Sequence, residues 1–334
     1  MISRDLVDPR EALIDGLLDI AGREDRLVVL DADVSRTSRT RRFRDAYPTR
    51  FYDFGVAEQN LFGVAAGLAA VGRIPVAVTF AIFASLRAAE PIRTSICYPR
   101  LNVKIIGGYA GLSNGKDGAT HQSLEDLAIM RSFANLVVMS PSDGVMARKM
   151  IQAAVGHLGP VYIRLEYEPV ACLYPNDFPF HIGRGYRLRE GSDVTVVAIG
   201  LAVGRAVRVA ETVASEGVSV EVLDVATLKP LDRELVLASV RKTGALVTVE
   251  DHTVMGGLAS AIGDCLLAEG LAPRFRALGI RDVFTESGPS EALREKYQVG
   301  AAAILEAVLE IAVDRPTRRA PANGSHTRWR ASQG

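Results

Sequence analysis

Short apolar runs alternate along the chain with longer segments whose apolar positions recur every three or four residues. The short runs predict buried strands, and the longer segments predict helices. In the first half the predicted strands are Leu27–Leu30, Phe51–Phe54, Pro75–Thr79, Val103–Ile106, Leu136–Met139 and Val161–Arg164. The helices predicted there are Arg10–Ala21, Thr40–Ala46, Gln59–Val71, Phe83–Tyr98 and Gly144–Ala154. This alternation predicts a parallel sheet covered on both faces.

A second alternating unit follows a segment rich in proline and aromatic residues. Its predicted strands are Val194–Gly200, Val218–Leu223, Gly244–Glu250 and Arg274–Leu278, and its predicted helices are Ala202–Glu216, Gly256–Glu269 and Ala301–Ala312. We therefore expect an α/β protein of two doubly wound domains, residues 1–166 and 183–314, joined by a linker at residues 167–182. Residues 315–334 lack an apolar period and are expected to be disordered.

Composition narrows the class of protein. The 39 basic residues balance 39 acidic ones, so neither nucleic acid nor an acidic membrane surface is indicated as a partner. Cys97, Cys172 and Cys265 lie far apart without a CxxC pair, which argues against a metal site or a disulfide framework. The first residues are polar, unlike a signal peptide, and the apolar runs are too short or too charged to span a bilayer. We expect a cytoplasmic enzyme.

Polar and aromatic residues cluster where the predicted strands end. Open α/β sheets bind ligands at the carboxyl ends of their strands. Asp33, Phe80 and Tyr109 come directly after strands, Glu58 stands at a helix start, and His121 closes a glycine-rich loop. We expect these side chains to share one edge of the first sheet.

Glu58 precedes a helix of small residues, Gly63 to Ala69. Such a face permits close packing against another backbone, so the carboxyl group is expected to be partly buried. A buried carboxyl group of this kind can hydrogen-bond a ring nitrogen and act in proton transfer. Taken alone, Glu58 equally fits a helix-start charge that favours the macrodipole by ~0.5 kcal/mol.

The loop between Gly107 and Gly118 contains five glycines and leads into the sequence Asp117-Gly-Ala-Thr-His121-Gln. A long loop after a buried strand is usually functional, although a lone loop histidine also fits mere solvent exposure. Phe80 and Phe83, three residues apart, can offer a flat face to an aromatic heterocycle or simply belong to the core.

These segments together resemble the C-terminal half of transketolase, most closely the small subunit of a split, two-gene transketolase. The resemblance rests on Ala57-Glu58-Gln-Asn, Thr79-Phe80 and the Asp117–Gln122 sequence, and covers roughly Pro9 to Ala312. It implies a pyrimidine-binding thiamine-diphosphate domain followed by a transketolase C-terminal domain. Val249-Glu-Asp-His252 and the following Gly256-Gly-Leu also resemble the latter, in a structural role.

The resemblance assigns roles to individual residues. Glu58 is implied to hydrogen-bond the ring nitrogen N1′ of the cofactor's aminopyrimidine and so to promote loss of the C2 proton. Phe80 and Phe83 are implied to stack on or flank the pyrimidine, and Asp33 to lie near the thiazolium. His121 is implied to assist proton transfer. The implied substrate-binding residues are Arg10, Ser35, Tyr109, Asp117, His121 and Arg164.

The chain departs from the family pattern at three places. Tyr109 stands where many transketolases have a phosphate-contacting histidine, and Leu86 stands where a tyrosine often flanks the pyrimidine. The motif Gly-Asp-Gly followed later by Asn, which supplies the metal ligands for the diphosphate, is absent from the sequence. We therefore expect Mg²⁺ or a similar ion to be held mainly by a partner, the diphosphate-binding subunit, in an assembly with two copies of each chain.

The implied reaction transfers a two-carbon ketol unit from a ketose, or its phosphate, to an aldehyde. Two related readings stay open: the β-subunit of a 2-oxoacid dehydrogenase, and a relative of deoxyxylulose-phosphate synthase. The alternative from another class of protein is a non-catalytic interaction subunit. Such a subunit would have no need of Glu58 or His121.

Overall fold

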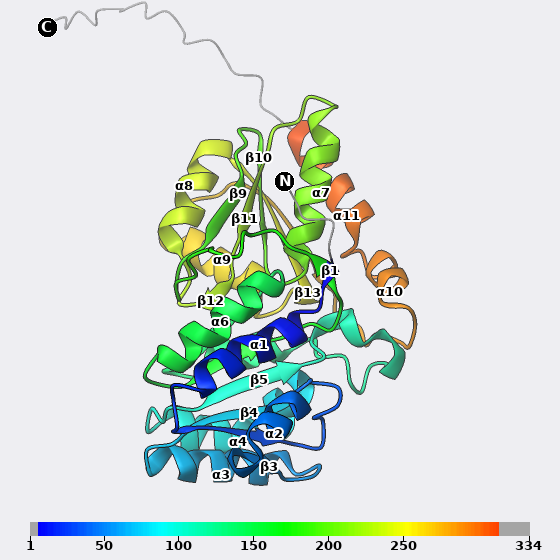
Figure 1. Ribbon diagram of the computed structural model, residues 1–334. Helices are drawn as coiled ribbons and strands as arrows, with labels where there is room; N and C mark the ends of the chain where they lie inside the picture. Colours follow the sequence, from blue (N-terminus) through cyan, green and yellow to red (C-terminus); the bar gives the residue numbers. More distant parts are fainter. Residues whose placement is uncertain (1–5, 314–334) are drawn as a thin grey trace, which may run out of the picture.

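A computed structural model describes residues 6–313; the predicted tail at residues 315–334 lies outside this range. Two sheets with flanking helices lie one above the other (Figure 1), the N-terminal one at the bottom of the view. None of the helices in residues 6–313 combines the length and apolarity needed to cross a membrane.

The first sheet has seven strands in the order β12-β6-β7-β5-β4-β2-β3. All pairs are parallel except β12 with β6. The bounds are β2 Leu27–Asp31, β3 Phe51–Asp53, β4 Ile74–Phe80, β5 Lys104–Gly108, β6 Val137–Met139, β7 Val161–Arg164 and β12 Thr227–Lys229. The helices around it are α1 Pro9–Ala21, α2 Arg41–Ala46, α3 Glu58–Ala70, α5 Asp126–Ser132 and α6 Gly144–Gly156.

Alternating side chains explain how this sheet is covered on both faces. In β2, Leu27 and Val29 join the core beneath α1 and α6, whereas Val28 and Leu30 join the core beneath α3 and α5. Successive strand side chains point to opposite faces, so an apolar run with no polar break needs cover on both. Helix α1 begins at a Pro after Asp8, whose side chain accepts a hydrogen bond from the Arg10 backbone N–H.

The second sheet has five strands in the order β14-β13-β10-β11-β9, with only β9 antiparallel. The bounds are β9 Tyr186–Arg189, β10 Val194–Ala198, β11 Val220–Asp224, β13 Ala245–Thr253 and β14 Arg274–Ile280. The helices are α7 Ala202–Ala214, α8 Arg233–Thr243, α9 Leu258–Ala268, α10 Ser290–Lys296 and α11 Ala301–Val313. Glu250 caps α9 by accepting from the N–H groups of Leu258 at 2.7 Å and Ala259 at 2.8 Å.

The single helix predicted over Phe83–Tyr98 was wrong. The chain there forms a π-helical turn η2 (Phe83–Arg87), a short α4 (Ala89–Pro91) and a second π-helical turn η3 (Ile92–Cys97). Pro91 has no N–H to give to the helix ladder, which accounts for the break at that point. π-Helical turns inside helices are often found at functional sites.

Several elements escaped the sequence pattern. Strand β12 comes from the C-terminal half of the chain yet completes the edge of the first sheet. Helices α5, α8 and α10 and strand β9 were not predicted. The segment predicted as a linker contains β8 (Val170–Ala171), which pairs with β1 (Leu6–Val7).

A buried ionic cluster joins the two domains. Asp251, at the end of β13, accepts from Arg205 of α7 and, at 2.8 Å, from Nε of Arg294 in α10. Arg164, at the end of β7, pairs with Asp126 at 3.1 Å and donates to the Asp251 backbone carbonyl at 2.7 Å. Burial raises the pKa of the Asp251 carboxyl group, but Arg205 and Arg294 outweigh it and hold that pKa below its ordinary value.

We expect Asp251→Ala to lower the free energy of unfolding by about 3–5 kcal/mol, because it leaves two buried guanidinium groups without their carboxylate. The matched control is Asp264→Ala, whose partner Arg131 lies 3.0 Å away but whose side chain is 72% exposed. It should cost at most about 1 kcal/mol. Urea unfolding of both variants measures the difference, and equal losses would contradict the importance of the buried cluster.

Candidate active site

The side chains expected at the sheet edge lie at the carboxyl ends of three neighbouring strands. Asp33 follows β2, Phe80 ends β4 and Tyr109 follows β5, and these strands adjoin in the order β5-β4-β2. Asp33 and Tyr109 both have positive φ, +60° and +57°. That conformation costs a non-glycine residue energy, and such strain is concentrated at functional sites.

Glu58 opens helix α3 and is only 2% exposed. Its carboxylate accepts from Nη1 of Arg87 at 3.4 Å, and the Arg87 guanidinium lies over the Phe83 ring, 4.6 Å from its centroid. Arg87 was missed by the sequence reasoning, although its place four residues after Phe83 in a helical segment puts the two on one face. One half-exposed cation, Arg87, thus contacts both the buried carboxylate and the Phe83 ring.

Aromatic rings form a continuous wall at the same edge. The rings of Phe80 and Phe83 are stacked with centroids 5.9 Å apart, and Phe80 contacts Tyr109 at 4.4 Å. His121 meets Phe83 edge-on at 5.4 Å, and its Nδ1 lies 2.9 Å from the Thr120 hydroxyl. The structure therefore brings His121, Phe80, Phe83 and Tyr109 together, as the sequence predicted.

A hollow of about 590 Å³ opens beside this wall. Phe83, Leu86 and Arg87 line one part of it, and Ala119 and Thr120 of the glycine-rich loop line another. Phe284, which follows β14 in the second domain, also lines it and is 86% exposed. Nothing in the sequence pattern singled out Phe284, because only the packing of the two domains brings it here.

The loop after β2 carries the predicted residues Asp33 and Ser35. Asp33 is exposed, and its backbone N–H donates to Oδ1 of Asp53 at 3.1 Å. Ser35 is half-buried, and its carbonyl accepts from the Arg41 N–H at 3.2 Å. Beneath this loop burial raises the pKa of Asp31 to about 6, while Thr40 donates to its carboxylate at 2.6 Å.

Asp117 is exposed on the glycine-rich loop. Its carboxylate accepts from the side-chain amide of Asn114 at 2.8 Å. It is four residues from His121 along the same loop.

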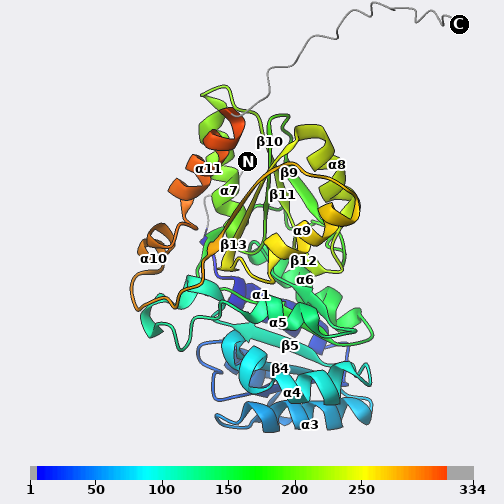
Figure 2. The ribbon, with the colours of Figure 1, turned by 180° about the vertical axis from the view of Figure 1, so that it is seen from behind.

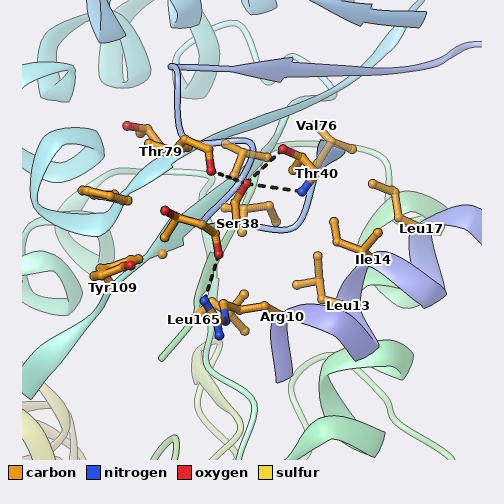
Figure 3. Close-up of a pocket in the computed structure, with 16 residues that line it drawn as sticks. Arg10, Leu13, Ile14, Leu17, Ser38, Thr40, Val76, Thr79, Tyr109 and Leu165 are labelled. Atoms are coloured by element: carbon orange, nitrogen blue, oxygen red, sulfur yellow. Dashed lines mark hydrogen bonds between the residues drawn. The ribbon is translucent and has the colours of Figure 1, made fainter. Parts of the chain in front are cut away.

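Arg10 does not offer a free guanidinium to a sugar phosphate. It is 6% exposed, its Nε and Nη2 donate to Asp8 at 2.9 and 2.7 Å, and its Nη1 donates to the Thr37 carbonyl at 2.9 Å. The bond from Arg10 to the loop is visible in Figure 3, beside a small pocket that Leu13, Ile14 and Leu17 also line. Arg10 therefore anchors the loop after β2 onto helix α1.

Arg164 likewise departs from the predicted role. Its side chain is fully buried, and its donors are taken by Asp126, Glu166 and the Asp251 carbonyl. A phosphate has no access to it, so Arg164 belongs to the ionic cluster between the domains. Asp126 lies 38 residues away along the chain and Asp251 lies in the other domain, so the sequence pattern did not indicate these partners.

Tyr167 was missed, and it completes the aromatic wall. Its ring contacts Tyr109 at 4.6 Å and carries the Arg10 guanidinium 3.7 Å from its centroid. Burial raises the pKa of Tyr109 to about 12. Burial also acts to raise the pKa of Tyr167, but its hydrogen bonds with Arg10 and Tyr109 prevail and lower it. Tyr109 and Tyr167 thus end the wall beyond Phe80, and Tyr109 is a neutral phenol.

Comparisons with known proteins agree with this architecture. Residues 6–169 match the family "Transketolase, pyrimidine binding domain", and residues 183–304 match "Transketolase, C-terminal domain". A subunit of 6-deoxy-6-sulfo-D-fructose transketolase from a Clostridium species is 42% identical over 90% of this chain and 94% of its own length. The 1-deoxy-D-xylulose-5-phosphate synthase of Heliobacterium modesticaldum is 35% identical over 89% of this chain but only 46% of its own.

A solved structure of similar length also matches the chain. A split gene transketolase, described as an inactive beta4 tetramer, is 45% identical, with a TM-score of 0.85 over 92% of this chain and 99% of its own. Both domains, in the same order, are thus matched over nearly the whole length of a protein of similar size. The chain belongs to the transketolase family and consists of its pyrimidine-binding domain followed by its C-terminal domain.

Proposed function

We propose that this chain is the cofactor-activating subunit of a heteromeric transketolase, which moves a two-carbon ketol unit from a ketose to an aldehyde. The observation that carries the proposal is the buried Glu58 carboxylate beside the Phe80–Phe83 wall, in a chain with the pyrimidine-binding half of the family. The family implies dependence on thiamine diphosphate.

The residues present fit the pyrimidine half of that cofactor. The stacked rings of Phe80 and Phe83 offer an apolar face to a flat heterocycle, and the hollow beside them has room for one. Within residues 6–313, the Glu58 carboxyl group has only its long contact to Arg87 to exchange for a ring nitrogen. When bound, the cofactor supplies the carbon nucleophile needed for ketol transfer.

The side chains at this edge of the sheet then have defined tasks. Glu58 holds a proton at a ring nitrogen, and its burial strengthens that hydrogen bond by excluding water. His121, held against Phe83, can give a proton to a substrate oxygen or take one from it. The exposed Asp33 and Asp117 and the half-buried Ser35 remain the proposed contacts to cofactor and sugar hydroxyls on either side.

The diphosphate and its Mg²⁺ are proposed to be held mainly by a second, diphosphate-binding subunit. The missing Gly-Asp-Gly…Asn motif supports this, as does the inactive beta4 state of the solved relative. Self-association into a 2+2 assembly is supported by helix α3, where an added Cβ at Gly63 or Gly67 would meet nothing within 4 Å. The buried free thiols of Cys97 and Cys265 suit the proposed cytoplasmic location.

The alternative readings are weaker. The matched deoxyxylulose-phosphate synthase is more than twice as long as the region it shares with this chain, whereas the transketolase subunit from Clostridium is matched over 94% of its length. The loop sequence Asp117–Gln122 favours transketolase over a 2-oxoacid dehydrogenase β-subunit. A panel of phosphorylated, sulfonated and free ketoses, assayed on the reconstituted pair, identifies the donor.

Glu58→Gln should lower kcat of the reconstituted enzyme by ~10²–10⁴-fold, the usual contribution of general acid–base catalysis. The amide fills the same space and still hydrogen-bonds, but it cannot donate a proton to a ring nitrogen. The measurements are exchange of the C2 proton on the bound cofactor in deuterium oxide and the melting temperature of the complex.

The matched control is Glu90→Gln, which changes an exposed carboxylate three residues after Arg87 and should leave exchange unaltered. If Glu58 were only a helix-start charge, its replacement would cost ~0.5 kcal/mol of stability and leave exchange normal. Normal exchange would therefore remove the catalytic assignment.

The isolated chain should be folded but should not bind thiamine diphosphate and Mg²⁺ tightly. The reason is that the ligands for the diphosphate are assigned to the partner subunit. Titration calorimetry with and without the partner measures the binding, and light scattering gives the stoichiometry of the pair. Tight binding by this chain alone would contradict the proposed division of the site, and a stable one-to-one heterodimer would contradict the 2+2 assembly.

Tyr109→His should raise the ratio of kcat/KM for phosphorylated over free aldehydes by about tenfold, the effect of one added charge-assisted hydrogen bond. Histidine can carry a positive charge next to the substrate, whereas Tyr109 is a neutral phenol. Tyr109→Phe, which keeps the ring contacts but adds no charge, is the control. An unchanged ratio in the histidine variant would refute this specificity role.

A further inference from the structure

A segment of the second domain lies across the loop that carries His121. We call residues 285–290, between β14 and α10, the strap, and residues 111–122 the glycine loop. The two views show the orange strap beside the glycine loop from both sides (Figures 1 and 2). The strap therefore lies against this piece of the proposed active site.

The backbones of the two segments are in direct contact. The Gly288 N–H donates to the Gly115 carbonyl at 2.9 Å, and the Ser290 hydroxyl donates to the Ser113 carbonyl at 3.3 Å. A Cβ on Gly115 would lie 2.2 Å from the Gly288 carbonyl oxygen, so only glycine permits this approach.

Gln122, the neighbour of His121 in the chain, is the side chain that ties the strap to the loop. It is 1% exposed, and its amide group donates to the Gly115 carbonyl at 3.3 Å and to the Glu286 carbonyl at 3.1 Å. Its amide oxygen accepts from the Thr285 hydroxyl. One buried side chain thus satisfies groups on both segments, and a buried amide without its partners would be costly.

The strap is itself fixed to the body of its domain. Helix α10, which follows it, is held by Arg294, whose guanidinium reaches Asp251 at 2.8 Å and Glu168 at 2.7 Å. At the other side the Ile280 carbonyl, at the end of β14, accepts from the Val254 N–H at 3.1 Å. The glycine loop is therefore braced against a segment whose two ends are fixed to the second domain.

We propose that the C-terminal domain positions His121 for ketol transfer through this strap, with Thr285 and Gln122 as positioning residues. The inference rests on the proposed function of His121. It gives the second domain a task in the reaction beyond packing, since the His121 backbone N–H is held by Gly118 within the braced loop at 3.0 Å.

The test compares Thr285→Val with Thr285→Ser. Valine keeps the shape of threonine but removes the donor to Gln122, whereas serine keeps the hydroxyl. Amide hydrogen exchange of the isolated chain reports the loop directly: exchange in residues 115–122 should become about tenfold faster in the valine variant and stay near wild type in the serine variant. Melting temperatures verify that both variants are folded.

In the reconstituted enzyme, Thr285→Val should lower kcat/KM for the ketose by about tenfold, a loss of transition-state stabilisation of about 1.4 kcal/mol. Exchange of the C2 proton, which depends on Glu58, should remain within about twofold of wild type. If Thr285 only stabilised the fold, its replacement would lower kcat/KM and C2 proton exchange together. Unchanged loop exchange, or a loosened loop with unchanged kcat/KM, would overturn the proposal.

Gly115→Ala provides a stronger disruption, because its Cβ collides with the strap backbone. Gly263→Ala in α9, where a Cβ meets nothing within 4 Å, is the matched control. Only the first should loosen residues 115–122. If the wild-type pair shows no ketol transfer while both disruptive variants still loosen the loop, the proposed function fails and the brace itself stands.

Discussion

A buried ionic cluster at the junction of the two domains constrains how they pack. Asp251 lies between Arg205 and Arg294 within the second domain, and Arg164 pairs with Asp126 within the first. Charges taken out of water are costly unless each finds its partner. Arg164 also donates to the Asp251 backbone carbonyl at 2.7 Å, so the two sets of buried charges are held against each other.

That placement matters because the candidate site draws on both domains. The hollow beside Phe83 is completed by Phe284, and the loop that carries His121 is contacted by the segment leading into α10. Arg294 contributes both to the buried cluster and to the placement of the loop that carries His121, since it pairs with Asp251 and belongs to α10. Domain packing and the geometry of the site are thus properties of one network.

The sequence predicted well what depends on local pattern. Fully buried strands such as β2 and β10 appear as unbroken apolar runs, and the shared edge of Asp33, Phe80 and Tyr109 follows from the rule for parallel sheets. It could not supply what depends on distant partners: the guanidinium of Arg164 is engaged by Asp126, and that of Arg10 by the Thr37 carbonyl. Tertiary packing also decides three features that the sequence did not predict. They are strand β12, the π-helical turns from Phe83 onward and the contact of Arg87 with Glu58.

The most direct test of the account is an experimental structure of this chain with its diphosphate-binding partner and thiamine diphosphate. The quantity to measure is the distance from the Glu58 carboxylate to the ring nitrogen N1′ of the pyrimidine. The account predicts a hydrogen bond, at about 2.6–3.2 Å, with the diphosphate on the partner subunit. A pyrimidine bound away from Glu58, or a diphosphate held by this chain alone, would contradict it.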